Sequence, residues 1–158
     1  MPAYIKFDGI DGEVVAEAFA GAFNVHSYEW GVSNSGTTGG GGGGAGKATF
    51  SDLSLTMTAG KGSPFLAHAC ASGKHIKTAK LTAVRTGRGR PETTLEVQLE
   101  DILVSSYQMN GESNGRPGEL VTLNFAKITY TQYFLDGENT RKKQTFTWDL
   151  KTGKGGVQ

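Results

Sequence analysis

Hydrophobic and polar residues alternate along most of this chain, and such alternation predicts strands with one buried face. The first alternating stretch is Tyr4–Asp8, where Ile5 and Phe7 share a face opposite Lys6. Further stretches cover residues 22–32, 47–58, 75–84, 93–109, 119–134 and 144–150. The segments 86–91, 110–118 and 135–142 between the later stretches are rich in Gly, Asn, Asp or Pro and predict turns.

Two of these stretches change phase. In residues 22–32 the apolar positions are odd up to Val25 and even from Tyr28, which predicts a bulge near His26–Ser27 or a strand with neither face in water. In residues 47–58 they change from even at Phe50 to odd at Leu53. We expect a second long strand with a shift of phase there.

One segment predicts a helix, over about residues 63–72. Ser63 is the expected N-cap, Pro64 occupies the first helical position, the interior is rich in alanine, and Gly73 follows the end. A helix this short needs packing against other elements, because isolated helices below about 12 residues are marginal.

These elements predict a mainly β protein, an antiparallel two-sheet β-barrel or sandwich with one short flanking helix. The length of 158 residues fits a single domain over 1–158 with a real core. Several strands carry apolar residues on both faces, and faces that one subunit cannot cover need partner subunits. The glycine-rich end, residues 151–158, is expected to be frayed.

Six consecutive glycines, Gly39 to Gly44, predict a long flexible loop over residues 33–46. Gly41 to Lys47 also satisfies the G-x-x-x-x-G-K part of a phosphate-binding loop. Position 48 is Ala, so the hydroxyl that would hold Mg²⁺ is missing, and a strand pattern follows where a helix is required. The sequence therefore favours a surface loop, or a loop that docks on a partner.

The net charge is only +1, but charges are distributed unevenly along the chain. Acidic residues dominate the first 30 positions (Asp8, Asp11, Glu13, Glu17 and Glu29), and basic residues dominate the segment up to position 90 (Lys61, Lys74, Lys77, Lys80, Arg85, Arg88 and Arg90). This asymmetry fits internal pairing, a solvated face, or complementary surfaces between copies. A nucleic-acid partner is disfavoured, because residues 74–90 have no aromatic side chain for base stacking.

The compartment is predicted from what the sequence lacks. Cys70 is the single cysteine, so no internal disulfide is expected, and no apolar run approaches 18 residues. The first residues have neither a basic nor an apolar signal region. We expect a protein made in the cytoplasm, without membrane insertion.

Candidates for chemistry are few, and we expect no catalytic, cofactor or metal site. His68, Cys70 and His75 leave a zinc site one ligand short, and His68 and Cys70 point to nearly opposite sides of the helix. Glu96, Gln98 and Glu100 share a strand face, as paired glycosidase carboxylates or as a solvated face. Trp30 and Trp148 could line a sugar-binding groove, although aromatic residues at strand spacing more often belong to a core.

Five motifs in collinear order resemble the Hcp family (haemolysin-coregulated protein), the tube subunit of type VI secretion systems. They are S-x-E-W-G at Ser27–Gly31, G-G-G-A-G-K ending at Lys47, A-S-G-K-H at Ala71–His75, L-V-S-S-Y at Leu103–Tyr107 and L-N-F-A-K at Leu123–Lys127. The resemblance runs from about Tyr4 to Leu150. Residues 13–23 are less charged than is usual in the family, and the turn at 86–92 is richer in arginine.

The resemblance implies a hexameric ring of β-barrels, stacked into a tube that a contracting sheath expels and that carries small effector proteins. Its implied partners are other copies of itself, a VgrG-type spike, the contractile sheath and the baseplate, and it implies export without a cleaved signal peptide. The loop implied to reach the adjacent ring contains Ser33, Asn34, Ser35, Gly36, Gly39, Gly40, Gly41, Gly42, Gly43, Gly44 and Gly46.

The polar loop 110–118 is a second expected contact. Its residues Asn110, Glu112, Ser113 and Asn114 are candidates for binding cargo in the lumen. Two alternatives remain open, a phage-type tail tube protein and a monomeric carbohydrate-binding β-sandwich.

Overall fold

The computed structural model describes residues 2–36, 46–86, 89 and 91–158. Strands dominate these residues: β1 (Ala3–Phe7), β2 (Phe23–Glu29), β3 (Val32–Asn34), β4 (Ala48–Phe50), β5 (Leu53–Thr58), β6 (Ile76–Thr86), β7 (Pro91–Asn110), β8 (Gly118–Leu135), β9 (Arg141–Asp149) and β10 (Lys154–Val157). A 3-10 turn, η1 (Glu17–Phe19), and one α-helix, α1 (Ser63–Ser72), complete the described elements. The expected mainly β class with one flanking helix is confirmed.

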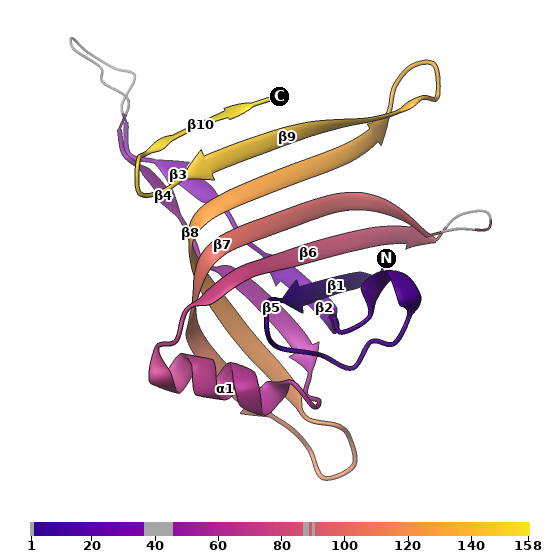
Figure 1. Ribbon diagram of the computed structural model, residues 1–158, viewed down its shortest axis with the longest axis vertical. Helices are drawn as coiled ribbons and strands as arrows, with labels where there is room; N and C mark the ends of the chain where they lie inside the picture. Colours follow the sequence, from indigo (N-terminus) through magenta and orange to yellow (C-terminus); the bar gives the residue numbers. More distant parts are fainter. Residues whose placement is uncertain (1, 37–45, 87–88, 90) are drawn as a thin grey trace.

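Six of the strands close into an antiparallel barrel (Figure 1). Their order is β8-β5-β2-β1-β6-β7, and pairing between β7 and β8 closes the circle. The helix α1 packs against β7. Strands β9 and β10 extend the sheet beyond β8, while β3 and β4 form a separate two-stranded sheet.

The two longest strands, β7 and β8, run through both parts of the molecule. Along β8, residues 118–123 pair with β5 inside the barrel, whereas residues 127–135 pair with β9 outside it. Strand β7 follows β8 along both parts, from Leu95 opposite Gln132 to Asn110 opposite Gly118. The long hairpin therefore joins a closed barrel to an open sheet.

The phase change near His26 has the predicted cause. Strand β2 pairs with β5 through a register shift between Val25 and Ser27, so the predicted bulge is confirmed. The second prediction, one long strand over residues 47–58, is wrong. The chain leaves β4 at Ser51 and enters β5 at Leu53 in a different sheet.

Polar bonds fix this change of sheet. The Ser51 amide donates to the Gly31 carbonyl over 2.9 Å, and the Gly31 amide donates to Ser51 Oγ over 2.8 Å. Gly31 lies between β2 and β3, and Ser51 lies between β4 and β5. The bonds between them therefore join the two places where the chain passes from one sheet to the other. The next residue, Asp52, accepts hydrogen bonds from Ser105 of β7 and Asn124 of β8. A shift of hydrophobic phase marks either a bulge or a change of sheet, and the sequence alone does not distinguish them.

The helix has the predicted limits but a different cap. Gly73 ends it with a φ of 71°, in the left-handed region that favours glycine. Gly62, not Ser63, is the N-cap residue. Ser63 is buried as the first helical residue, and its hydroxyl accepts a hydrogen bond from the Gly60 amide over 2.9 Å.

An aromatic cluster fills the space between the β3–β4 hairpin and the open sheet. Phe50 of β4 lies 6.3–6.5 Å, between ring centroids, from Trp30, Phe146 and Trp148. It also meets Phe125 of β8 edge-on, at 6.2 Å. Offset and edge-on pairs at these distances are favourable. This cluster is an extension of the barrel core, because its members pack against the buried residues there.

A carboxylate is buried at the start of β8. Glu119 of β8 is only 3% exposed, and its Oε2 accepts a hydrogen bond from the Tyr107 hydroxyl of β7. Burial of the phenol and the bond to Glu119 raise the pKa of Tyr107 to about 12. Tyr107 therefore keeps its phenolic proton and can donate it in the hydrogen bond to Glu119.

The C-terminal end differs from the expected frayed tail. Residues 154–157 form β10, which pairs with β9 from Lys154 opposite Asp149 to Val157 opposite Phe146. Backbone bonds between Thr145 and Gln158, 2.8 and 2.9 Å long, extend the ladder to the last residue. All four residues of β10 are exposed, so the strand needs no alternating apolar pattern, and its backbone pairing with β9 is enough to order it.

We predict that Gly155→Ala destabilises the protein, whereas Gly156→Ala leaves it nearly unchanged. A Cβ at position 155 would lie 1.9 Å from the Thr147 carbonyl oxygen, while one at position 156 would meet nothing within 4 Å. Relief of this clash requires β10 to move from β9, at a cost of about 1–3 kcal/mol. Thermal unfolding of both variants measures the difference, and equal melting temperatures would contradict the pairing of Gly155 with β9.

A second prediction concerns the buried carboxylate. Tyr107→Phe leaves Glu119 without its hydroxyl donor and is expected to lower the free energy of unfolding by roughly 2 kcal/mol. Because the folded state holds the Tyr107 proton more tightly than the unfolded state, the wild-type protein should lose stability between pH 10 and about 12, the raised pKa of Tyr107. Tyr107→Phe should remove this loss.

Tyr133→Phe is the matched control, measured by urea unfolding at pH 7 and across this alkaline range. Tyr133 donates to Glu96 over 3.1 Å, but Glu96 also pairs with Lys80 and its side chain is 24% exposed. The control should therefore cost less than Tyr107→Phe. If both variants lose the same free energy of unfolding, the burial of Glu119 does not explain the importance of the Tyr107 hydroxyl.

Candidate assembly surfaces

The stem of the glycine-rich loop is closed by polar bonds. Ser33 and Asn34 end β3, and Ser35 and Gly36 follow it directly. Asn34 Nδ2 donates to the Gly46 carbonyl over 3.1 Å, and Asn34 Oδ1 accepts from the Gly36 amide over 2.7 Å. A Cβ at position 46 would lie 2.1 Å from the Gly36 nitrogen, so the two sides of the stem approach too closely for a side chain there.

The remaining predicted loop residues, Gly39 to Gly44, lie outside the described residues. A strand, β4, begins at Ala48 directly after the stem. A phosphate-binding loop requires a helix N-terminus at this point, and the strand supplies none. The structure therefore agrees with rejecting a nucleotide site here.

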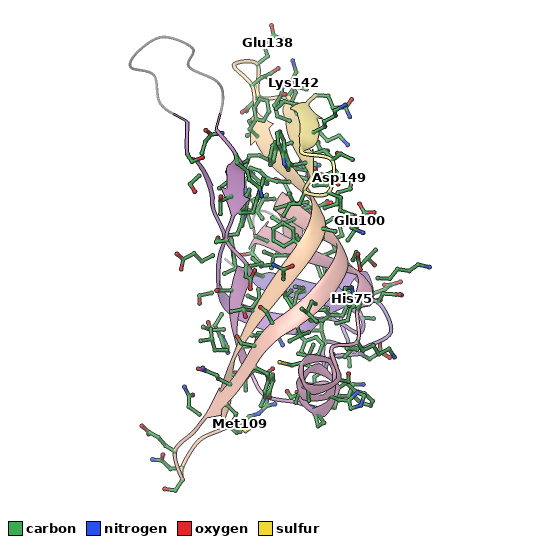
Figure 2. The ribbon with its side chains drawn as sticks, turned by 90° about the vertical axis from the view of Figure 1, so that its left-hand side faces the viewer. His75, Glu100, Met109, Glu138, Lys142 and Asp149 are labelled. Carbon is green, nitrogen blue, oxygen red and sulfur yellow. The ribbon has the colours of Figure 1, made fainter. Side chains whose placement is uncertain are left out.

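The predicted cargo residues lie at one end of the molecule. Asn110 ends β7, and Glu112, Ser113 and Asn114 follow in the turn before β8, all of them exposed. Figure 2 shows Met109 near this end, and Glu138 and Lys142 at the opposite end of the long axis. The structure groups the four candidate residues together and separates them from the stem of the glycine-rich loop.

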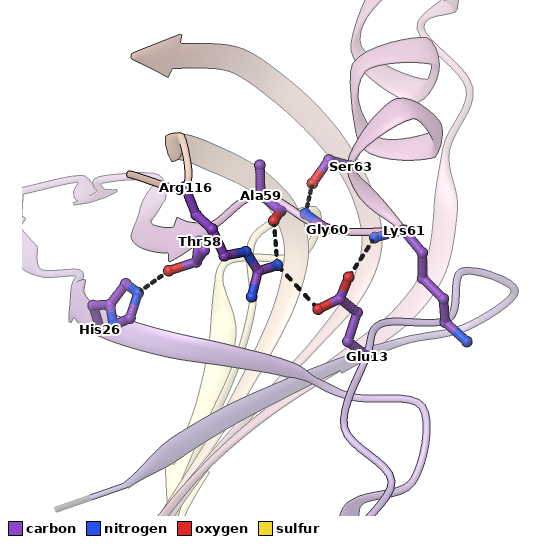
Figure 3. A network of polar contacts seen from close by, with 8 residues as sticks. All are labelled: Glu13, His26, Thr58, Ala59, Gly60, Lys61, Ser63 and Arg116. Atoms are coloured by element: carbon purple, nitrogen blue, oxygen red, sulfur yellow. Dashed lines mark hydrogen bonds and ion pairs between the residues drawn. The ribbon is translucent and has the colours of Figure 1, made fainter. Parts of the chain in front are cut away.

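Arg116 ties this turn back to the barrel (Figure 3). Its guanidinium donates to Glu13 Oε2 over 3.1 Å and to the Ala59 carbonyl over 2.8 Å. Glu13 Oε1 also accepts from the Lys61 amide over 3.1 Å. The bonds from Arg116 and Lys61 lower the pKa of the Glu13 carboxyl, so this contact is present above the ordinary pKa of a glutamate and is lost in acid.

Asp101 joins three segments in a similar way. His75 Nδ1 lies 2.6 Å from its Oδ1, and Lys151 Nζ lies 3.3 Å from its Oδ2. The hydrogen bond with His75, and to a smaller extent that with Lys151, lowers the pKa of Asp101. Asp101 has a φ of 54°, a left-handed conformation that asparagine and aspartate adopt more readily than other non-glycine residues. The side chain is thereby directed to both partners.

The other candidates for chemistry are the histidine–cysteine set near the helix and the row of acidic residues on β7. Within the described parts of the chain, no three His, Cys, Asp or Glu side chains gather as ligands for a metal. Cys70 packs against the core while His68 is exposed. Glu96 and Glu100 pair with Lys80 at 3.0 Å and Lys127 at 3.8 Å, as expected of a solvated strand face.

The tryptophans and the charge asymmetry have structural explanations. Trp30 stacks on Phe50 and Trp148 stacks on Phe146, and both tryptophans pack against the core. Part of the basic segment is neutralised within the subunit, because Lys80 pairs with Glu96 and Arg85 pairs with Glu92 at 2.8 Å. No described helix is long and apolar enough to cross a membrane.

The contacts of Arg116 and Asp101 were not predicted from the sequence. Glu13 and Arg116 lie 103 positions apart, and Asp101 and Lys151 lie 50 apart. No local pattern connects residues so distant. The one local signal is that two acidic residues, Glu100 and Asp101, interrupt the alternation between Leu99 and Ile102.

Comparison with known proteins places these surfaces in context. The family model described as "Type VI secretion system effector, Hcp" matches residues 4–132. Protein hcp1 of Pseudomonas aeruginosa is 37% identical over 108 residues, which cover 66% of this chain and 67% of that protein.

Solved structures agree with the sequence matches. A structure described as that of a type six secretion system protein superimposes with a TM-score of 0.87 at 28% identity, over 98% of this chain and 99% of that chain. Hcp1 from Salmonella typhimurium superimposes with a TM-score of 0.79 at 26% identity, over 98% and 97% of the two chains. The chain belongs to the Hcp family of type VI secretion system proteins.

Proposed function

We propose that this protein forms homohexameric rings that stack into the hollow inner tube expelled by a type VI secretion system. The observation that carries the proposal is the superposition on a type six secretion system protein over nearly the whole of both chains. Exposed apolar side chains support it, because Phe65, Met109 and Val157 are 62%, 55% and 71% exposed. Apolar surface of this kind on a folded subunit favours contacts with other subunits.

The proposed role is structural and needs no catalysis, cofactor or metal. Its proposed partners are copies of itself, a VgrG-type spike at the tip, the contractile sheath, the baseplate and small effector proteins in the lumen. Asn110, Glu112, Ser113 and Asn114 are the proposed cargo contacts, since they are exposed polar side chains grouped in one turn. Nucleic-acid binding and membrane insertion form no part of this role, and export would proceed without a cleaved signal peptide.

The proposal predicts the solution mass of the purified protein. Six copies of 16.7 kDa give a particle of about 100 kDa. Light scattering at micromolar concentration should give this mass, and negative-stain images of the same fraction should contain annular particles. A monomer at all salt concentrations would contradict ring formation and favour a module that acts alone.

The glycine-rich loop generates a second prediction. Deletion of Gly39 to Gly44 should leave single rings intact but weaken their stacking, because the loop over residues 33–46 is proposed to reach the adjacent ring. Sedimentation of concentrated protein measures stacking, and scattering of dilute protein measures the ring.

A matched control keeps the length of the loop, with alternating Gly and Ser at positions 39–44, and should stack like the parent. Loss of the ring itself in the deletion variant would assign the loop to contacts between neighbours in one ring.

A further inference from the structure

One short segment of the surface projects an apolar side chain into solvent. Val15 is 90% exposed, more than any other large hydrophobic side chain in the described residues. Glu17, two positions later, is also exposed, and no described residue forms an ion pair with it. We name residues 13–20, which contain η1, the acidic projection.

The acidic projection is held rigid at its base. The Gly12 amide donates to the Gly21 carbonyl over 2.8 Å, and the Gly21 amide donates to the Val14 carbonyl over 2.9 Å. Phe19 stacks on Tyr4 of β1 with 4.4 Å between ring centroids. The bonds of Glu13 to Arg116 and Lys61 fix the same base from the other side. A preorganised projection loses little conformational entropy on binding, which makes it suited to insertion into a partner.

A cleft of complementary character lies beside the helix. It has a volume of about 280 Å³ and lies between α1, the turn after β1 and the start of β6. Phe65, 62% exposed, provides its apolar wall. Lys74, Lys77 and His68 line it as well, and Asp8 is the one carboxylate among its described lining residues. His75 is also at the cleft but is bonded to Asp101.

The two features cannot meet within one subunit. Figure 1 places η1 beside the N-terminus, on the opposite flank of the barrel from the connection between α1 and β6. Two different complementary surfaces on opposite flanks of a subunit are the requirement of a head-to-tail contact, which closes into a ring if the rotation between copies permits.

We propose that the acidic projection of one subunit inserts into the α1–β6 cleft of the next, with Val15 against Phe65 and Glu17 facing Lys74 and Lys77. The proposal rests on the ring proposed above and specifies which surfaces join its neighbours. The apolar pair supplies desolvated contact at the centre, and the charges around it favour this partner and this orientation.

Chemical cross-linking tests the contact directly. In a Cys70→Ala background, Val15→Cys and Phe65→Cys together should give covalent multimers up to the hexamer with a short bis-maleimide, resolved on a denaturing gel. Val15→Cys with Met109→Cys is the control, because Met109 is 55% exposed and lies outside the cleft. The control pair should give at least about tenfold less multimer at equal protein concentration.

The outcomes separate this inference from the proposed ring. Intact rings of about 100 kDa in which the Val15–Phe65 pair links no better than the control would overturn the contact and leave the ring standing. A monomeric Cys70→Ala parent, with wild-type protein also monomeric, would overturn the ring and the contact together. Rings with strong, pair-specific linking support both.

Charge reversal provides an independent measurement. Glu17→Lys and Lys77→Glu are each expected to weaken subunit association by about tenfold, since each places like charges opposite one another. The double variant should recover most of the loss, because the attraction is restored with its sign exchanged. Single reversals that leave the ring unaffected, or a double variant no better than the singles, would contradict the pairing of these residues.

Discussion

The continuous pairing of β7 with β8 is the constraint on which the rest of the structure depends. β7 has 20 residues and β8 has 18, and β8 exchanges one partner, β5, for another, β9, along its length. Its paired residues on β7 run from Leu95 to Asn110 without a change of partner strand. The continuous hairpin therefore holds both parts together, and the exchange of β5 for β9 along β8 marks where the open sheet begins.

An open sheet has an exposed face, and the sequence covers it with aromatic side chains. The chain leaves the barrel at Gly31 and returns at Leu53, and between them it forms β3 and β4 beside the open sheet. Phe50 then stacks against Phe146 and meets Trp148 of β9 at a tilt. The separate β3–β4 hairpin thus extends the core and, at the same time, positions the stem of the glycine-rich loop.

Local patterns predicted the parts of this fold that local chemistry determines. Pro64 and Gly73 limited the helix, and the change of phase after Val25 located a bulge. The sheet change at Ser51 was missed, because its cause is a set of bonds from Gly31 and from Asp52 to two distant strands. Strand β10 was missed because Gly155 and Gly156 give no pattern of burial. The family motifs predicted the Hcp family, but no motif predicted the ties made by Arg116 or Asp101.

The polar contacts of Arg116 and Asp101 hold connecting segments at the surface of the subunit in place. Arg116 ties the turn before β8 to segments distant in sequence, and Asp101, within β7, ties the residues just before β6 and just after β9. A loop that becomes ordered only on association lowers the affinity of the contact that it makes, because its conformational entropy is lost on binding. A ring repeats the same contact at every interface, so that loss is repeated as well. Polar ties that order the connecting segments before assembly therefore favour a closed ring more than additional apolar surface would, because they add rigidity without promoting nonspecific aggregation.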